Sequence, residues 1–198
     1  ISALSTLAYD GRRGRFFEGQ LMAALKILQR GDVSADRMTG SWAGAMGHTQ
    51  FIPTSYLAYA VDFGGDGKRD IWSDDPTDAL ASTAAYLSRS GWKRGQRWGE
   101  EITGRAPSGR GRVVKPAGDG GPVFEVYHNY SVLGRYNNAQ KYIIGVGHLS
   151  DRLAGRPALR GPASHQPNGA ACSRLSSSKK VGSASQPKAR LALTASPS

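Results

Sequence analysis

The segment from Phe16 to Arg30, FFEGQLMAALKILQR, constrains the fold most strongly because its apolar residues recur at helical spacing. They stand at positions 17, 21, 24, 25 and 28, which places them on one side of an α-helix. Gly31 follows, and glycine commonly ends a helix. The segment therefore predicts an amphipathic helix, which must pack against other elements to bury its apolar side.

Three more segments, 53–60, 75–90 and 138–154, are predicted to be helices. Pro53 suits a first helical turn, and Asp75 with Pro76 suits an N-cap and first turn. Apolar spacing predicts that these helices turn the following residues inward: Tyr56, Leu57 and Ala60; Leu80, Thr83, Ala84 and Leu87; Tyr142, Ile143, Val146, Leu149 and Leu153.

One strand is predicted at 123–127, VFEVY, where apolar and polar residues alternate. The alternation points Glu125 outward. Residues 102–122 are rich in Gly, Pro, Arg and Lys and predict a surface loop or a weak hairpin. Gly145 and Gly147 weaken the last helix but would let another element approach it closely. The chain is therefore expected to be mainly α with a small strand element.

The chain of 198 residues suits one domain with an appendage. We expect the domain over 1–154 and a disordered, basic, low-complexity tail over 155–198, which has few aromatic residues with which to offset the entropy of ordering. No apolar run reaches the length of a membrane span. The chain opens on Ile1 with neither a start Met nor a leader, so we expect that an N-terminal segment is missing.

A net charge of +11 suggests an acidic polymer as partner, with nucleic acid as one hypothesis. However, seven of the 26 basic residues lie in 155–198, where no acidic residue is found. Most of the excess charge therefore belongs to the tail, which weakens the nucleic-acid hypothesis. The single cysteine, Cys172, excludes an internal disulfide and a CxxC metal site.

An acidic loop follows position 61, with the sequence DFGGDGKRDIWSDDPTD. Asp62, Asp66 and Asp70 stand at positions one, five and nine of an EF-hand-like Ca²⁺ loop, with a glycine at position six. The pattern departs from an EF-hand at Gly64, which offers no side-chain ligand, and at Ser73, where a glutamate is usual. Asp78 would close the site instead. A turn that caps the next helix is the alternative interpretation.

Catalytic signals are sparse. The four glutamates, Glu18, Glu100, Glu101 and Glu125, each fit a structural role better than a catalytic one. The histidines at 48, 128, 148 and 165 lack metal-ligand spacing, and residues 64–67 lack the Lys-Ser/Thr of a phosphate loop.

Aromatic and amide side chains are more suggestive, because sugars pack their C–H faces on rings and their hydroxyls bond to amides. Many of these residues could equally belong to the core. They are Trp42, Gln50, Phe51, Tyr56, Tyr59, Tyr86, Tyr127, Tyr136, Asn137, Asn138 and Tyr142.

These residues lie in blocks that resemble a known family. The blocks are LSTLAYDGRRGRFF, GSWAGAMGHTQFIPTSYLAYAVDFGGDGKRDIW, DALASTAAYLSRSGW and RYNNAQKYIIGVGHLSDRLAG. In order and spacing they are similar to the membrane-bound B type of lytic murein transglycosylases, over 1–155. The resemblance implies a lysozyme-like fold and cleavage of the β-1,4 bond between N-acetylmuramic acid (MurNAc) and N-acetylglucosamine (GlcNAc) in peptidoglycan.

In that family one glutamic acid protonates the glycosidic oxygen and then acts as the base for attack by the C6 hydroxyl, leaving a 1,6-anhydro end. Ordinary hydrolases use two carboxylates instead. None of the four glutamates here matches the family's acid, which is expected upstream of Ile1. The resemblance therefore implies no catalytic residue in this chain, and we expect the chain alone to be inactive, in effect a peptidoglycan-binding protein.

The resemblance also implies binding residues. Arg12 and Arg13 would pair with substrate carboxylates. The other groove positions are Ser41, Gln50, Phe51, Tyr86, Tyr136, Asn137 and Tyr142, of which Gln50 and Phe51 form a pair that contacts sugar. A structural Ca²⁺ would be held by Asp62, Asp66, the Lys68 carbonyl and Asp78. No cofactor is needed for the chemistry.

As to setting, the resemblance implies a monomer that acts on glycan strands in the periplasm or at the outer membrane of a Gram-negative bacterium. No nucleic-acid partner is expected.

Overall fold

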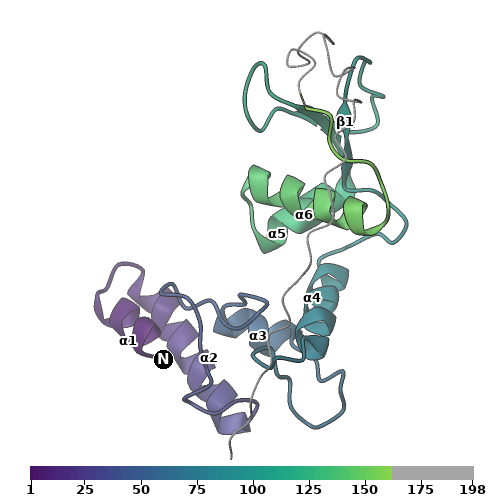
Figure 1. The fold of residues 1–198 in the computed structure, drawn as a ribbon. Helices are drawn as coiled ribbons and strands as arrows, with labels where there is room; N and C mark the ends of the chain where they lie inside the picture. Colours follow the sequence, from purple (N-terminus) through teal and green to yellow (C-terminus); the bar gives the residue numbers. More distant parts are fainter. Residues whose placement is uncertain (162–198) are drawn as a thin grey trace, which may run out of the picture. The chain divides into compact units, whose positions relative to one another are not determined.

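The structure is a computed structural model that describes residues 1–161, in which helices predominate (Figure 1). The elements are α1 (Ser2–Tyr9), α2 (Gly14–Arg30), α3 (Pro53–Tyr59), α4 (Thr77–Arg89), β1 (Gly99–Ile102), β2 (Arg112–Val114), β3 (Val123–Val126), α5 (His128–Tyr136) and α6 (Gln140–Leu153). The four predicted helices and the predicted strand are present. Helices α1 and α5 and strand β1 were not predicted. Residues 102–122, expected to form a surface loop or a weak hairpin, contain β2, which pairs with β3.

The first core is formed by helices α1, α2, α3 and α4 and by the loops between them. Its buried residues include Leu4 of α1, Ile27 of α2 and Tyr56 of α3. On α2 the predicted apolar side is largely correct, since Phe17, Leu21, Ala24 and Leu28 all pack in this core. Leu25 is the exception and remains 43% exposed.

The inward side of α4 differs from the prediction. Leu80 is 67% exposed, whereas Asp78 and Ser82 are buried. The reason is that α4 packs against loop backbone, whose N–H groups need acceptors. The Asp78 carboxylate accepts hydrogen bonds from Phe63 N and Gly64 N, and Ser82 Oγ accepts one from Val61 N. Apolar periodicity cannot reveal a polar buried side of this kind.

The second core lies between the three-stranded sheet and the helices that follow it (Figure 1). The sheet is antiparallel in the order β1-β3-β2. Phe124 and Val126 of β3 pack with Trp98, with Leu133 of α5 and with Ile143 of α6. The last two elements of the described chain therefore cover the sheet.

Helix α6 buries Ile143, Ile144 and Gly147, a narrower side than predicted. Tyr142, Leu149 and Leu153 are 41%, 59% and 83% exposed. The expectation of a close contact at a glycine is confirmed at Gly147, because a Cβ there would lie 2.7 Å from Cγ of Trp98. A Cβ at Gly145 would have no atom of another element within 4 Å, so this glycine makes no such contact.

Glu125 does not point outward, and this prediction was wrong. Its side chain is fully buried, and the loop before β2 wraps around it. The carboxylate accepts hydrogen bonds from Ser108 N (2.7 Å), Ser108 Oγ (2.9 Å), Arg110 N (3.0 Å) and Gly111 N (3.0 Å). The bond from Ser108 N is the largest influence that holds the pKa of Glu125 below its ordinary value.

The chain remains in contact with the domain beyond the predicted boundary at 154. Arg156 Nε pairs with Asp151 at 3.3 Å, and the backbone N–H groups of Arg160 and Gly161 donate to the Glu101 carboxylate. The first seven residues of the predicted tail therefore do not follow the expectation of disorder. The rest of that expectation, with His165 and Cys172, lies outside the described residues.

No helix of residues 1–161 combines the length and the apolar character needed to cross a lipid bilayer.

Candidate functional site

The loop of residues 40–53 doubles back on itself before α3. Ser41 N donates to Ala45 O at 2.7 Å and Met46 N to Phe51 O at 2.8 Å, and two isolated bridges pair Met46 with Gly40 and Phe51. The Ser41 hydroxyl accepts from Ala45 N at 3.1 Å. Ser41 is therefore occupied, in part, in closing its own turn.

The glycines of this loop have structural reasons. A Cβ at Gly40 would overlap the Ala45 carbonyl oxygen, and one at Gly47 would overlap the Ile71 carbonyl oxygen. Gly47 also has φ +54°, a conformation that side chains disfavour. Small residues at these positions let the loop pack tightly on itself and on a neighbouring segment.

Phe51 belongs to an aromatic cluster and is only 3% exposed. Its ring centroid is 5.7 Å from that of Tyr86 and 5.7 Å from that of Tyr136, while Tyr86 and Tyr136 are 4.9 Å apart. Tyr59 adds a fourth ring, 4.6 Å from Tyr86. The expected direct contact of Phe51 with sugar does not fit this burial, because the ring supports the loop from beneath.

Two hydroxyls fix this cluster. Tyr86 OH donates to Arg135 O at 2.7 Å, and Tyr136 OH donates to Thr49 O inside the loop. Burial raises the pKa of both tyrosines, that of Tyr136 to about 12. Both phenols therefore remain protonated and act as donors. Tyr86 and Tyr136 bring α4 and the end of α5 to the same loop.

Other predicted residues lie on separate segments. Arg12 and Arg13 form the turn before α2, where the Arg13 guanidinium lies 4.4 Å from the centre of the Phe16 ring. Asn137 lies in the turn before α6, where its side chain accepts from Ala139 N at 3.0 Å. Among the described residues, no hydrogen bond or ion pair joins Arg12, Arg13 or Tyr142 to the aromatic cluster.

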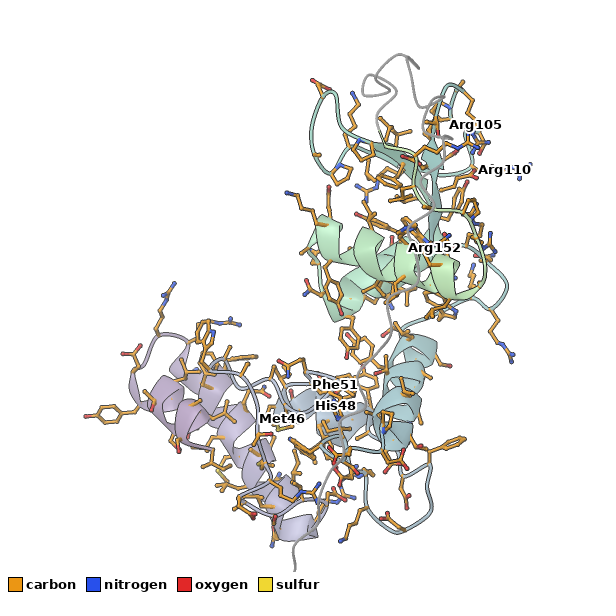
Figure 2. All side chains as sticks on the ribbon, viewed as in Figure 1. Met46, His48, Phe51, Arg105, Arg110 and Arg152 are labelled. Carbon is orange, nitrogen blue, oxygen red and sulfur yellow. The ribbon has the colours of Figure 1, made fainter. Side chains whose placement is uncertain are left out.

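The 40–53 loop is also bound to the end of the acidic loop, a link that sequence patterns did not predict. His48 N donates to Ile71 O at 2.9 Å, and His48 Nε2 lies 2.8 Å from Ser73 O. Trp72 Nε1 donates to Thr39 O at 2.8 Å. Figure 2 shows Met46, His48 and Phe51 along this loop. No spacing rule could have indicated these long-range bonds to backbone.

The acidic loop gathers three carboxylates. One oxygen each of Asp62, Asp66 and Asp78 lies within 4.8 Å of the others. A set of carboxylate oxygens is the donor type that Ca²⁺ prefers, so these residues fit the ion that the resemblance implies. Asp70 is not in this group, and its Oδ1 accepts from Trp72 N and Ser73 N. The third carboxylate of the cluster is thus Asp78, and not Asp70 at position nine of the EF-hand-like pattern.

The acidic loop is also a hydrogen-bonded turn, as the alternative interpretation expects, although the N-cap of α4 is Pro76 and no side chain caps the helix. Asp75 Oδ1 accepts from Thr77 N and from the Thr77 hydroxyl at the start of α4. Asp62 accepts from Gly65 N and Gly67 N within its own turn. The loop therefore has a stable hydrogen-bonded form in which the carboxylates already face one another.

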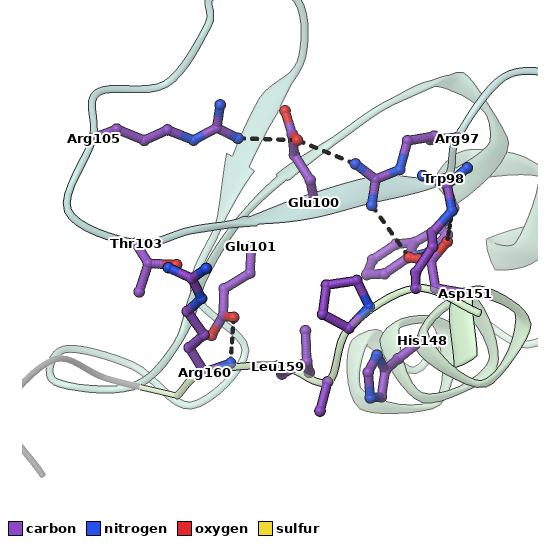
Figure 3. Close-up of a pocket in the computed structure, with 13 residues that line it drawn as sticks. Arg97, Trp98, Glu100, Glu101, Thr103, Arg105, His148, Asp151, Leu159 and Arg160 are labelled. Carbon is purple, nitrogen blue, oxygen red and sulfur yellow. Dashed lines mark hydrogen bonds and ion pairs between the residues drawn. The ribbon is translucent and has the colours of Figure 1, made fainter. Parts of the chain in front are cut away.

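A cavity of about 390 Å³ lies between β1, α6 and the segment after α6 (Figure 3). Arg97 bridges Glu100 at 3.1 Å and Asp151 at 3.3 Å, and Arg105 also pairs with Glu100 at 2.9 Å. A hydrogen bond from Tyr127 leads the causes that lower the pKa of Glu100. Glu100 and Glu101 are thus occupied in structural contacts, as expected.

These observations define a class of protein. The fold is lysozyme-like: mainly helical, with a small antiparallel sheet, and with an amide-bearing loop supported by tyrosines. Comparison with known proteins agrees. The transglycosylase SLT domain family matches residues 1–111 and 103–151. The chain belongs to this family, and its similarity is to the B-type lytic transglycosylases.

Individual relatives are similar over this region. Membrane-bound lytic murein transglycosylase B of Escherichia coli is 41% identical over 108 residues, 54% of this chain and 29% of the relative. The crystal structure of SltB3 from Pseudomonas aeruginosa in complex with NAG-anhNAM-pentapeptide has a TM-score of 0.72 and 48% identity. It matches over 78% of this chain and 50% of its own.

The Escherichia coli lytic transglycosylase Slt35 in complex with calcium has a TM-score of 0.64 and 30% identity, over 77% of this chain and 58% of its own. The chain thus spans between roughly a third and somewhat over half of the length of these relatives.

Proposed function

We propose that this chain is the part of a peptidoglycan lytic transglycosylase that binds the glycan strand, with the 40–53 loop as one side of the groove. The observation that carries the proposal is the aromatic cluster of Phe51, Tyr59, Tyr86 and Tyr136, which supports a loop with an exposed amide, Gln50. SltB3, with which the chain shares 48% identity, was crystallised with NAG-anhNAM-pentapeptide.

In this proposal the binding residues divide by depth. Gln50, Asn137 and Tyr142 are exposed and would contact sugar hydroxyl and acetamido groups, while Ser41, Tyr86 and Tyr136 are partly buried at the groove floor. Trp42, 82% exposed in the same loop, is an additional ring on which a sugar could pack. Arg12 and Arg13 would pair with lactyl or peptide carboxylates.

The proposed reaction is cleavage of the MurNAc–GlcNAc β-1,4 bond with formation of a 1,6-anhydro end. It requires a carboxylic acid at the glycosidic oxygen. Glu100, Glu101 and Glu125 are engaged in the sheet region, and Glu18 is exposed on α2. We therefore propose that the acid comes from the part of the relatives that this chain does not span.

The alternative is a peptidoglycan-binding protein without catalysis. The observation that favours it is that the four glutamates lie in the sheet region or exposed on α2 and not in the 40–53 loop. Both versions place the protein in a bacterial cell envelope, in the periplasm or at the outer membrane, acting as a monomer on glycan strands.

A structural Ca²⁺ is part of the proposal. Asp62, Asp66 and Asp78 would hold the ion with the Lys68 carbonyl, and its role would be to fix the acidic loop rather than to take part in chemistry.

Two measurements test the proposed function. Purified sacculi should sediment the chain, and Gln50→Ala should reduce the bound fraction. A version extended with the upstream region of a B-type relative should release 1,6-anhydro muropeptides, identified by mass. Reducing ends would instead indicate a hydrolase. Failure to bind sacculi would contradict both versions of the proposal.

A further inference from the structure

The turn at residues 49–51 is held from both sides of Gln50. Thr49 O accepts the hydroxyl of Tyr136, and Phe51 N donates to Thr49 Oγ1 at 3.2 Å. Thr49 itself is buried, 5% exposed. The exposed Gln50 therefore sits between two residues whose backbone groups are bonded and buried.

Gln50 has a left-handed backbone, with φ +51°. Only one other non-glycine residue of 1–161, Arg13, shares this property. The conformation costs a non-glycine residue on the order of 1 kcal/mol and persists only where the surroundings hold it. Gln50 N donates to Gly47 O at 3.2 Å, and the bonds at Thr49 and Phe51 add restraints on either side.

This backbone determines where the Gln50 amide points. Nε2 donates to Gly47 O at 2.8 Å, so the amide is folded back over its own turn. No described residue donates to Oε1, which leaves an oriented acceptor on the exposed side of the loop. A substrate hydroxyl or acetamido N–H is the kind of group that such an acceptor recognises.

Tyr136 is suited to set this geometry although it is 87 residues away along the chain. It is the last residue of α5, and its ring packs on Phe51 and Tyr86. The hydroxyl donates to Thr49 O, and the Thr83 side chain is a second polar group beside it. Burial raises the pKa of Tyr136 to about 12, so the donor is present at every pH at which the protein would act.

We propose that Tyr136 is a positioning residue: its hydroxyl, by holding the Thr49 carbonyl, maintains the left-handed Gln50 and aims the Gln50 amide at a glycan acetamido or hydroxyl group. This role rests on the proposed function. It differs from the direct sugar contact that the family resemblance implies for Tyr136, because here the residue acts through Gln50.

The test compares Tyr136→Phe with Tyr56→Phe in the full chain. Both changes remove a phenol that donates to a backbone carbonyl in the same core, since Tyr56 OH donates to Arg69 O at 2.6 Å. The readouts are the ¹H–¹⁵N signals of the Gln50 backbone and side-chain amides without ligand, and the affinity for chitotetraose. We expect Tyr136→Phe to shift both Gln50 signals and to weaken binding about tenfold, the weight of one or two hydrogen bonds. Tyr56→Phe should do neither.

A double-mutant cycle separates positioning from direct contact. Gln50→Asn keeps a residue that tolerates the left-handed backbone but shortens the reach of the amide. If Tyr136 acts through Gln50, adding Tyr136→Phe to Gln50→Asn should lower the affinity little further. Additive losses would overturn the proposal in favour of a direct contact.

Different results would refute the positioning role of Tyr136 and the proposed function. Unchanged Gln50 signals in Tyr136→Phe would refute the positioning role whether or not the glycan binds. Shifted signals in a chain that does not bind chitotetraose or sacculi at all would refute the proposed function, and with it the glycan part of this inference.

Discussion

At the scale of single residues, Glu125 shows how a side chain can organise a loop. Its carboxylate accepts three backbone N–H groups and one hydroxyl from residues 108–111, which have no regular structure of their own. A buried charge is tolerated because these donors replace water. The loop before β2 therefore depends on a residue that lies 14 to 17 positions further along the chain.

The pH dependence of this contact can be predicted. Because the folded pKa of Glu125 lies below its ordinary value of 4.5, the contact stabilises the fold above that pH and is lost as the pH falls below it. Glu125→Gln should therefore lower the thermal midpoint near neutral pH and reduce the loss of stability on acidification. Thermal melts across this range measure both effects. Glu18→Gln, on the exposed side of α2, is the control and should change neither.

At the scale of elements, the packing of α6 on Trp98, the residue before β1, depends on a glycine, Gly147, which has no side chain. Trp98 lies over Gly147 and also donates from Nε1 to Asp151 at 3.1 Å. The helix thus fixes the indole ring both by apolar contact and by a hydrogen bond from its next turn. A glycine that weakens the helix in isolation strengthens the domain by admitting the ring.

A matched pair of substitutions in α6 tests this. Gly147→Ala should destabilise the fold by about 1–3 kcal/mol, because the methyl group would overlap the Trp98 ring. Gly145→Ala, two residues away with open space around it, should stabilise the fold by up to about 1 kcal/mol through helix propensity. Urea denaturation measures both. Equal effects would contradict the role of the Trp98 contact.

The acidic loop is the second element with a testable property. If Ca²⁺ binds only the folded state, excess ion should raise the free energy of unfolding, by about 2.7 kcal/mol at a hundredfold excess over the dissociation constant. Asp78→Asn should abolish the calcium-dependent rise in the thermal midpoint. Asp74→Asn alters a neighbouring exposed carboxylate outside the cluster and should retain it. A midpoint that is the same in calcium and in chelator would contradict the proposed site.

At the scale of the whole molecule, the segment after α6 makes further contacts with the domain. Residues 156–161 run along β1, where Arg160 N and Gly161 N bond to Glu101 at 2.7 and 2.9 Å. Beyond Gly161 the sequence has five basic residues and no acidic one. Residues 162–198 therefore carry +5 of the net charge of +11, and a substantial part of the attraction to anionic polymers should reside there, separately from glycan binding.

Two truncations separate these contributions. A chain ending at Gly161 should melt like the full chain and bind sacculi like it, but should elute from an anionic resin at lower salt, because it loses +5 of the net charge of +11. A chain ending at Gly155 should in addition lose about 1–3 kcal/mol of stability, since the bonds to Glu101 and the Arg156–Asp151 pair are removed. Identical melts of the two truncated chains would refute the contribution of 156–161.

The sequence alone determined the main helices, the strand at 123–126, the family and two of the three carboxylates in the EF-hand-like pattern, with Asp78 proposed to close the site. The helices, the strand and the acidic pattern follow from local spacing, which acts over a few residues, whereas the family follows from the resemblance of four sequence blocks. Only the tertiary structure decided which side chains are buried through polar contacts or through contacts between distant parts of the chain. Asp78 and Ser82 are buried on α4 because loop N–H groups need acceptors. Phe51 is buried and Gln50 is exposed in a turn whose Thr49 carbonyl accepts from Tyr136, 87 residues further along the chain.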